Sequence, residues 1–241
     1  MKYLPLLLVV VLSACHKNQS SLDITTGLVV NIPFDGNTVD AVSGVTGVNY
    51  RATFGPDHHY NAGKGLQFNA ADSATVDFGA LPLASFDSTN QFTISFWVKV
   101  ADTTAPIAVL SKRGDTGPWE YSIDNQFNHK GFVLDNWTGN GQTSVYGTDP
   151  LSAFVDIVPG QWQHLAYVAD GNTLSVYVNG VLQAGIDQRN MGYSFGKTSA
   201  HLVIGNGGGY GRNYYFNGGI DDIRMYNIAL PAATIQFLAK Q

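Results

Sequence analysis

The chain has 241 residues, a formal net charge of −5 and 27 glycines, with aromatic residues at 12% and charged residues at 13%. Glycine permits positive φ in turns and aromatic residues favour pleated surfaces, so this composition indicates many short strands joined by turns. The negative charge argues against a nucleic-acid partner, which would require a basic surface. The length alone fits one large all-β domain or two small domains.

Residues 1–15 have the features of a secretory signal. The apolar run from Leu4 to Leu12 is too short to span about 30 Å of hydrocarbon as a helix. Residues 12–15, Leu-Ser-Ala-Cys, resemble the bacterial lipobox, and Cys15 is the only cysteine in the chain. The sequence therefore predicts a lipoprotein signal peptide with acylation at Cys15. The alternative is an ordinary signal cleaved near Ala14.

Residues 16–26 form a polar stretch without a period, which predicts a short tether. Several acyl chains on one residue give durable membrane attachment, because each buried CH₂ contributes about 0.8 kcal/mol. Lys17 is not an aspartate, so an inner-membrane retention signal is not apparent. We expect attachment to the outer membrane of a bacterial cell envelope, with the leaflet left open.

Residues 27–241 are expected to form one domain built from short strands. Residues 27–34 predict a first strand, followed by the turn cluster 35–37, and residues 66–69 and 74–78 predict two more. Residues 91–100 alternate without a break and predict a strand with Phe92, Ile94, Phe96 and Val98 on its buried side.

The second half of the domain continues the same pattern. Residues 107–112, 120–124 and 132–137 read as strands, residues 162–169 and 174–178 flank an Asp-Gly turn, and residues 202–204 and 216–227 complete the set. Pro231 stands at a first-turn position of a short closing helix over residues 230–239. The chain is therefore predicted to be all-β, a jelly-roll β-sandwich of two antiparallel sheets with a short C-terminal helix.

The strand at residues 216–227 carries a carboxylate in an unexpected place. Read at a period of two, Asp221 shares a face with Ile223 and Met225. A carboxylate on an apolar face is tolerated only when it is paired, hydrogen-bonded or bound to a metal. We therefore expect Asp221 to have a specific partner.

Five motifs in this order resemble the laminin-G-like jelly roll of the concanavalin A-like lectin and glucanase superfamily. They are Pro33–Asn37, Phe92–Lys99, Trp162–His164, Val176–Gly180 and Phe216–Asn227. The resemblance implies the jelly-roll fold, but this fold hosts lectins, glycosidases and adhesion modules.

The resemblance also implies a structural calcium ion that ties the first strand to the last. Asp221 is then a side-chain ligand, and carbonyls near Asp35 and near Gly65 complete the shell, since calcium takes six to eight oxygens in loose geometry. The alternative is that Asp221 pairs with an arginine or caps backbone amides. Asp222 is expected to face solvent or pair with a cation.

The sequence favours a protein that is not an enzyme. Jelly-roll glycosidases resemble one another in a pair of glutamates on one strand, whereas Glu120 is the only glutamate here. Glu120 and Asp124 could form a substitute pair, but we expect both to be surface residues at strand ends. His164 is expected to be framework, and His58 and His59 to be solvated.

Two groups of loop residues have the chemistry of a lectin site, which needs an exposed aromatic platform beside polar groups. The first group is Trp119, Asp135, Asn136 and Trp137, and the second is Tyr210, Arg212, Asn213, Tyr214 and Tyr215. As candidate ligand-binding residues they predict a carbohydrate-binding, lectin-like domain. The alternatives are half-buried packing residues, and a module that recognises a protein surface.

Overall fold

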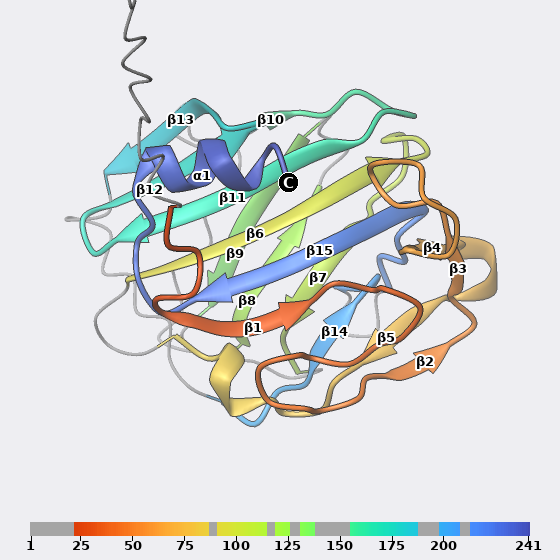
Figure 1. The fold of residues 1–241 in the computed structure, drawn as a ribbon. Coiled ribbons are helices and arrows are strands. Elements are labelled where there is room, and N and C mark those ends of the chain that lie inside the picture. Colours follow the sequence, from red (N-terminus) through yellow and green to blue (C-terminus); the bar gives the residue numbers. More distant parts are fainter. Residues whose placement is uncertain are drawn as a thin grey trace, which may run out of the picture.

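The computed structural model describes residues 22–86, 91–114, 119–125, 131–137, 155–187, 198–207 and 213–241, and its strands form two antiparallel sheets (Figure 1). Sheet I contains, in spatial order, β13 (Val181–Asp187), β12 (Thr173–Val178), β11 (Gln163–Asp170), β6 (Gln91–Val100), β15 (Gly218–Tyr226), β4 (Gly65–Phe68) and β3 (Thr53–Gly55), and β1 (Leu28–Ile32) also pairs with β15. Cys15 and the predicted signal lie outside the described residues.

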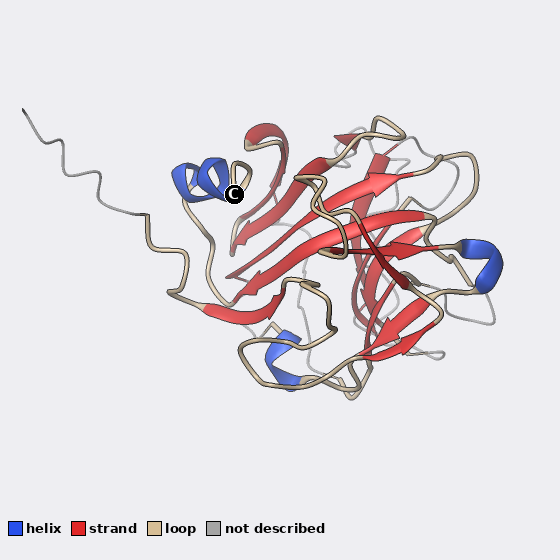
Figure 2. Ribbon diagram, turned by 45° about the vertical axis from the view of Figure 1, so that its right-hand side comes forward, coloured by secondary structure: helices blue, strands red, loops and turns tan. Residues whose placement is uncertain are grey.

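Sheet II faces sheet I across the core, as Figure 2 shows. It contains, in spatial order, β10 (Val155–Asp156), β9 (Gly131–Trp137), β8 (Trp119–Asp124), β7 (Ala108–Lys112), β14 (Leu202–Ile204), β5 (Thr75–Asp77) and β2 (Val48–Tyr50). Two 3₁₀ turns, Ala70–Asp72 and Pro82–Ala84, and one helix, α1 (Ala232–Leu238), complete the described elements. The predicted all-β jelly-roll sandwich with a short C-terminal helix is confirmed.

The core lies between the two sheets and follows from the alternation in β6. Phe92, Ile94, Phe96, Val98 and Val100 are all fully buried in it, as the sequence predicted. The opposite face of β6 carries Thr93, Ser95, Trp97 and Lys99, so this face is the outer surface of sheet I.

A second, smaller apolar cluster covers part of that outer surface. Ile235 and Leu238 of α1 pack with Ala166 and Val168 of β11, and Figure 1 shows the helix lying over these strands. Ile24 packs at the edge of this cluster, and its carbonyl accepts a hydrogen bond of 3.1 Å from the Tyr226 hydroxyl. Ile24, which the sequence assigned to the tether 16–26, therefore packs against the domain.

A β-bulge in β15 changes the face on which Asp221 lies. The register against β6 shifts between Asp221 and Arg224, and Asp222 has a φ of 50°. Ile220 and Ile223 consequently both point into the core, while Asp221 pairs with Trp97 and lies on the outer surface of sheet I. The expectation that Asp221 shares the face of Ile223 and Met225 was wrong, because the extra residue of the bulge breaks the period of two.

No helix in the described part of the chain is both long enough and apolar enough to cross a membrane.

Candidate functional site

The first predicted ligand group lies at one end of sheet II. Trp119 begins β8 and Trp137 ends β9, and the two residues are direct register partners. Asn136 precedes Trp137 in β9. The backbone therefore places the two tryptophan positions side by side, with Asn136 next to Trp137 along β9.

The second predicted ligand group lies elsewhere. Tyr210 and Arg212 lie outside the described residues, whereas Tyr214 is placed by its backbone. The Tyr214 carbonyl accepts a hydrogen bond of 2.8 Å from the Ala108 amide, and Ala108 pairs with Asp124 at the far end of β8. Because β8 rises about 3.3 Å per residue, Tyr214 is about 17 Å along the strand from Trp119. The two groups are not one site.

Between these ends, the outer side of β8 is polar and buried. Tyr121 and Ile123 of β8 point into the core, so the residues that alternate with them, Glu120, Ser122 and Asp124, share the outer side. All three are at most 1% exposed. The segment Asn206–Gly207 lies against this surface, since a Cβ on Gly207 would be 2.4 Å from the Ala108 Cβ. The expectation that Glu120 and Asp124 are surface residues was therefore wrong.

The Glu120 and Asp124 carboxylates can be buried because each lies near a cation and accepts a hydrogen bond from a hydroxyl group. The Lys112 Nζ lies 3.2 Å from the Glu120 Oε1, and both side chains are fully buried. The same oxygen accepts hydrogen bonds from the Thr198 amide at 2.6 Å and from the Thr198 hydroxyl at 3.0 Å. Asp124 accepts a hydrogen bond of 2.7 Å from the Ser122 hydroxyl, and its carboxylate lies 4.0 Å from the Arg113 guanidinium.

Lys112 also holds the surrounding backbone together. Its ammonium donates to the Ala80 carbonyl at 2.6 Å and to the Ala200 carbonyl at 2.7 Å. Burial lowers the pKa of Lys112, and the neighbouring Glu120 carboxylate opposes this shift. The Lys112–Glu120 pair thus joins β7 and β8 to the segment that precedes β14 and to Ala80, which follows β5.

Sheet I also carries a buried carboxylate that the sequence singled out, Asp221. The Asp221 Oδ2 lies 2.6 Å from the His58 Nδ1 and accepts a hydrogen bond of 3.3 Å from the His58 amide. Its Oδ1 accepts one of 2.9 Å from the Asp222 amide. Asp222 in turn accepts a hydrogen bond of 3.1 Å from Arg224. The expectation that Asp221 has a specific partner is confirmed, as is the cation partner of Asp222.

The partner is His58, and the expectation that its side chain is solvated was wrong. Its side chain is 5% exposed and its ring stacks on Trp97 at a centroid distance of 4.3 Å and an interplanar angle of 7°. Its Nε2 lies 2.6 Å from the Gln241 carbonyl oxygen. Burial acts to lower the pKa of His58, but the contacts with Asp221 and Gln241 outweigh burial and raise the pKa above its usual value.

The predicted calcium ligands are not arranged as a calcium shell. The Asp35 carboxylate pairs with Lys64 at 3.2 Å, and the Asp221 carboxylate faces nitrogen donors. Gly65 pairs with Gly55 at the start of β4. Within the described ranges, no group of three or more metal-ligating side chains is present. These donors differ from the six to eight oxygens that calcium takes, and calcium binding stays a prediction.

His164 has the surroundings of a framework residue. It is 1% exposed, its Nε2 lies 2.8 Å from the Ser95 hydroxyl, and its amide donates to the Asn179 side chain at 2.9 Å. Burial, and then the positive charges of Arg224 and His58, lower the pKa of His164 to about 3. The imidazole is therefore neutral near pH 7 and serves the packing of β6 against β11.

Comparison with known proteins identifies the family and the fold that this architecture matches. The sequence model of a family described as the concanavalin A-like lectin/glucanases superfamily matches residues 68–236, which is more than half of the chain. A search of curated proteins gave no match.

Several solved structures have the same fold. Domain 4 of AbnA, a GH43 extracellular arabinanase from Geobacillus stearothermophilus solved in complex with arabinotriose, is similar with a TM-score of 0.63 and 24% identity, over 88% of this chain and 98% of that domain. The binding domain of Paraclostridial Mosquitocidal Protein 1 is similar with a TM-score of 0.68 and 15% identity, over 88% of this chain and 52% of that one.

A toxin domain with a protein receptor is also similar. The binding domain of botulinum neurotoxin DC, in complex with rat synaptotagmin II, has a TM-score of 0.61 and 14% identity, over 89% of this chain and 51% of its own. The chain thus spans about half the length of the two toxin binding domains but nearly all of the arabinanase domain.

Proposed function

This chain belongs to the concanavalin A-like lectin/glucanases superfamily, and on that basis we propose that it binds a glycan without cleaving it. The domain similar to it over 98% of its length was solved with arabinotriose. At 24% identity this similarity shows a shared fold but does not identify the ligand of this chain. It therefore indicates only which glycan to test first.

The observation that carries the non-catalytic proposal is the state of Glu120. A glycosidase needs two carboxyl groups about 5–10 Å apart with access to the substrate. Glu120, the only glutamate, is buried and bonded to Lys112 and Thr198. Asp124, four positions further along β8, is about 13 Å away at the rise of a strand. This pair therefore has neither the spacing nor the access that glycoside hydrolysis requires.

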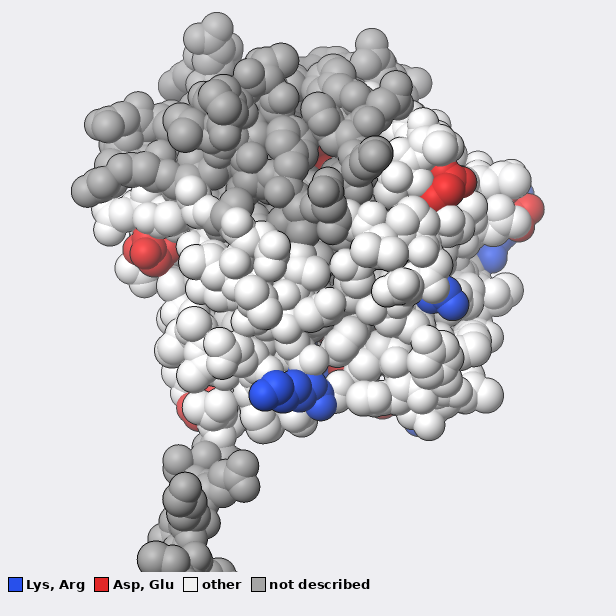
Figure 3. Space-filling model, turned by 90° about the horizontal axis from the view of Figure 1, so that it is seen from above, with Lys and Arg blue, Asp and Glu red and all other residues white. Residues whose placement is uncertain are grey.

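The surface also fits a neutral ligand better than a polyanion. Figure 3 shows the molecule from above, and the described part of that side is mostly uncharged, with lysine and arginine side chains scattered rather than gathered. Nucleic acids require a basic footprint, whereas sugars are recognised by aromatic faces and short polar groups. We propose that the glycan binds at the end of sheet II where Trp119 and Trp137 pair, with Trp119, Asn136 and Trp137 as contacts. Contacts by Tyr210, Arg212 and Tyr214 stay a separate prediction from the sequence.

Replacing Trp137 with alanine should abolish binding to polysaccharides that the wild type retains. The reason is that removal of an aromatic platform deletes the surface on which a sugar ring stacks. Affinity electrophoresis of the purified domain in gels containing arabinan, xylan or mixed-linkage glucan measures the effect. Tyr214→Ala tests the second group separately, and Tyr177→Ala, on the helix-covered side of sheet I, is the control. Unchanged retention of both variants would contradict the assignment of these residues.

A protein-binding module is the second candidate, and the similar toxin domain solved with rat synaptotagmin II favours considering it. Absence of retention in every polysaccharide gel, together with capture of one identified protein partner, would replace the glycan proposal with this one. Cleavage of a polysaccharide by the purified domain that Glu120→Gln stops would establish an enzyme instead.

We also propose that Cys15 carries a lipid that attaches the protein to the bacterial outer membrane. Cys15→Ser should release the protein into the soluble fraction, because the acyl chains supply the membrane affinity. Fractionation of cells that express each form, followed by detection of the domain, measures the effect. Continued sedimentation of Cys15→Ser with membranes would refute the anchor.

Structural calcium binding is tested by thermal unfolding. If Asp221 and carbonyls near Asp35 and Gly65 hold the ion, millimolar calcium should raise the Tm of metal-free protein, because a ligand that binds only the folded state stabilises it. Asp221→Asn should remove that rise. An identical Tm with calcium and with chelator would rule out the ion at this place.

A further inference from the structure

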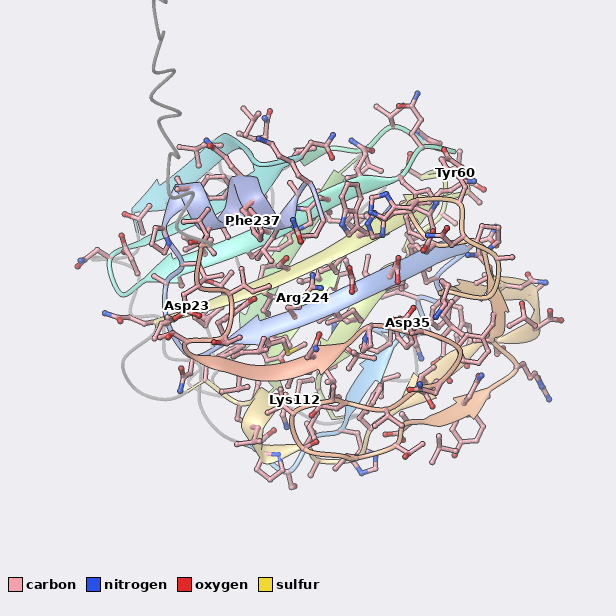
Figure 4. All side chains as sticks on the ribbon, in the orientation of Figure 1. Asp23, Asp35, Tyr60, Lys112, Arg224 and Phe237 are labelled. Carbon is pink, nitrogen blue, oxygen red and sulfur yellow. The ribbon has the colours of Figure 1, made fainter. Side chains whose placement is uncertain are left out.

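The loop between β3 and β4 displays a tyrosine in an unusual way. Tyr60 is 72% exposed, more than any other large hydrophobic residue in the described part of the chain. Its φ is 64°, in the left-handed region that residues other than glycine seldom adopt. Figure 4 shows Tyr60 projecting at the periphery of the molecule. The loop thus holds a bulky side chain outward on a backbone conformation that is unfavourable for residues other than glycine.

Hydrogen bonds within the loop hold this conformation. The carboxylate of Asp57, which is 7% exposed, accepts from the His59 amide at 2.8 Å and from the Asn61 amide at 2.7 Å. Its second oxygen accepts from the Asn61 side-chain amide at 2.9 Å. The Tyr60 amide donates to the Asp57 carbonyl at 3.0 Å. The backbone on both sides of Tyr60 is therefore fixed to a single buried carboxylate.

His58 fixes the same loop to sheet I. Its ring stacks on Trp97 and bonds to Asp221 and to the Gln241 carbonyl. His58, which lies between the hydrogen-bonded Asp57 and the exposed His59, therefore attaches the loop to sheet I. A ligand that contacts Tyr60 would not need to order the backbone, which removes a large part of the usual cost of binding.

Polar residues precede and follow Tyr60 in the loop. His59 and Asn61 are exposed on either side of Tyr60, and the Lys64–Asp35 ion pair, about half-exposed, joins the loop to the turn after β1. None of the other exposed large hydrophobic residues of the described ranges lies in residues 55–65. The centre of a protein interface is apolar and closely packed, whereas a sugar needs one aromatic face flanked by amides and charged groups. The chemistry around Tyr60 fits the sugar.

We propose that the loop at residues 56–61 is a second glycan-contact surface, on sheet I, in which the face of Tyr60 stacks against a sugar ring. This surface is separate from Trp119 and Trp137, which lie on sheet II. The proposal rests on the proposed glycan-binding function and adds a contact that the motifs of the sequence did not indicate.

The test compares four proteins in gels containing arabinan, xylan or mixed-linkage glucan: the wild type, Tyr60→Ala, Tyr60→Phe and Tyr50→Ala. Tyr60→Ala should weaken retention about tenfold on at least one polysaccharide that the wild type binds, as expected for loss of one stacked aromatic contact. Tyr60→Phe keeps the ring face and should bind as the wild type does. Tyr50 is also exposed, at 52%, so Tyr50→Ala controls for the loss of a surface tyrosine.

Tyr60→Gly provides a second variant without the ring, and glycine accepts the left-handed φ without strain. Weak retention by both Tyr60→Ala and Tyr60→Gly supports the proposal. If both variants bind as tightly as the wild type, this second surface is wrong while glycan binding at sheet II stands. If the wild type binds none of the polysaccharides, the proposed function fails and this surface fails with it.

Discussion

Glu120→Ala is expected to lower the free energy of unfolding by about 3–5 kcal/mol, because it leaves the Lys112 ammonium buried without its counter-ion. Lys112 and Glu120 are both fully buried, so water cannot replace the lost carboxylate. The Thr198 amide and hydroxyl lose their acceptor at the same time. Urea unfolding followed by tryptophan fluorescence measures the change.

Two further variants separate the charge from the hydrogen bonds. Glu120→Gln retains an oxygen that can accept from Thr198 and should cost less than Glu120→Ala. Lys112→Met combined with Glu120→Ala removes both charges, so the double variant should be more stable than the sum of the single losses indicates. Additive losses in this cycle would show that the two charges do not interact, contrary to the 3.2 Å separation of their atoms.

The main framework of the fold could be predicted because its signals are local. The alternation of β6 identifies the buried face without any knowledge of its neighbours. The Asp-Gly turn at residues 170–171 likewise fixes the pairing of β11 with β12. The expectation that Trp119 and Trp137 come from neighbouring strands was confirmed by their register.

The position of Asp221 could not be predicted in the same way. A β-bulge adds one residue to a strand, and nothing in an alternating pattern marks where that residue is inserted. Asp222 occupies the bulge with a φ of 50°, which aspartate tolerates better than most residues. The partner His58 is separated from Asp221 by 163 residues, so their contact depends on the tertiary fold.

The burial of Glu120 depends on the tertiary fold for the same reason. Thr198 lies 78 residues away in sequence, and only the order of strands in sheet II brings it to the start of β8. The sequence identified Glu120 correctly as the only glutamate, but it gave no signal that Lys112 would neutralise it. Glu120 therefore forms a buried ion pair with Lys112 and is not an exposed carboxylate at a strand end.

Gly218→Ala should prevent the domain from folding to its native state, with a loss of about 4 kcal/mol or more. Gly218 begins β15 between β6 and β4 and has a φ of 143°. A Cβ at this position would lie 2.0 Å from the Lys99 backbone oxygen, which cannot move without separating β15 from β6.

Two other glycines provide a graded comparison for the same substitution. Gly44 has a φ of 75° but nothing within 4 Å of a Cβ, so Gly44→Ala should cost only about 1–2 kcal/mol for the left-handed backbone. A Cβ on Gly219 would be 2.6 Å from the Trp162 ring, a side chain that can shift, so Gly219→Ala should fall between the two. Soluble yield and thermal unfolding by circular dichroism should rank the losses as Gly44, Gly219 and then Gly218. A Gly218→Ala protein as stable as Gly44→Ala would contradict the close approach of β15 to β6, on which the outer-surface position of Asp221 also depends.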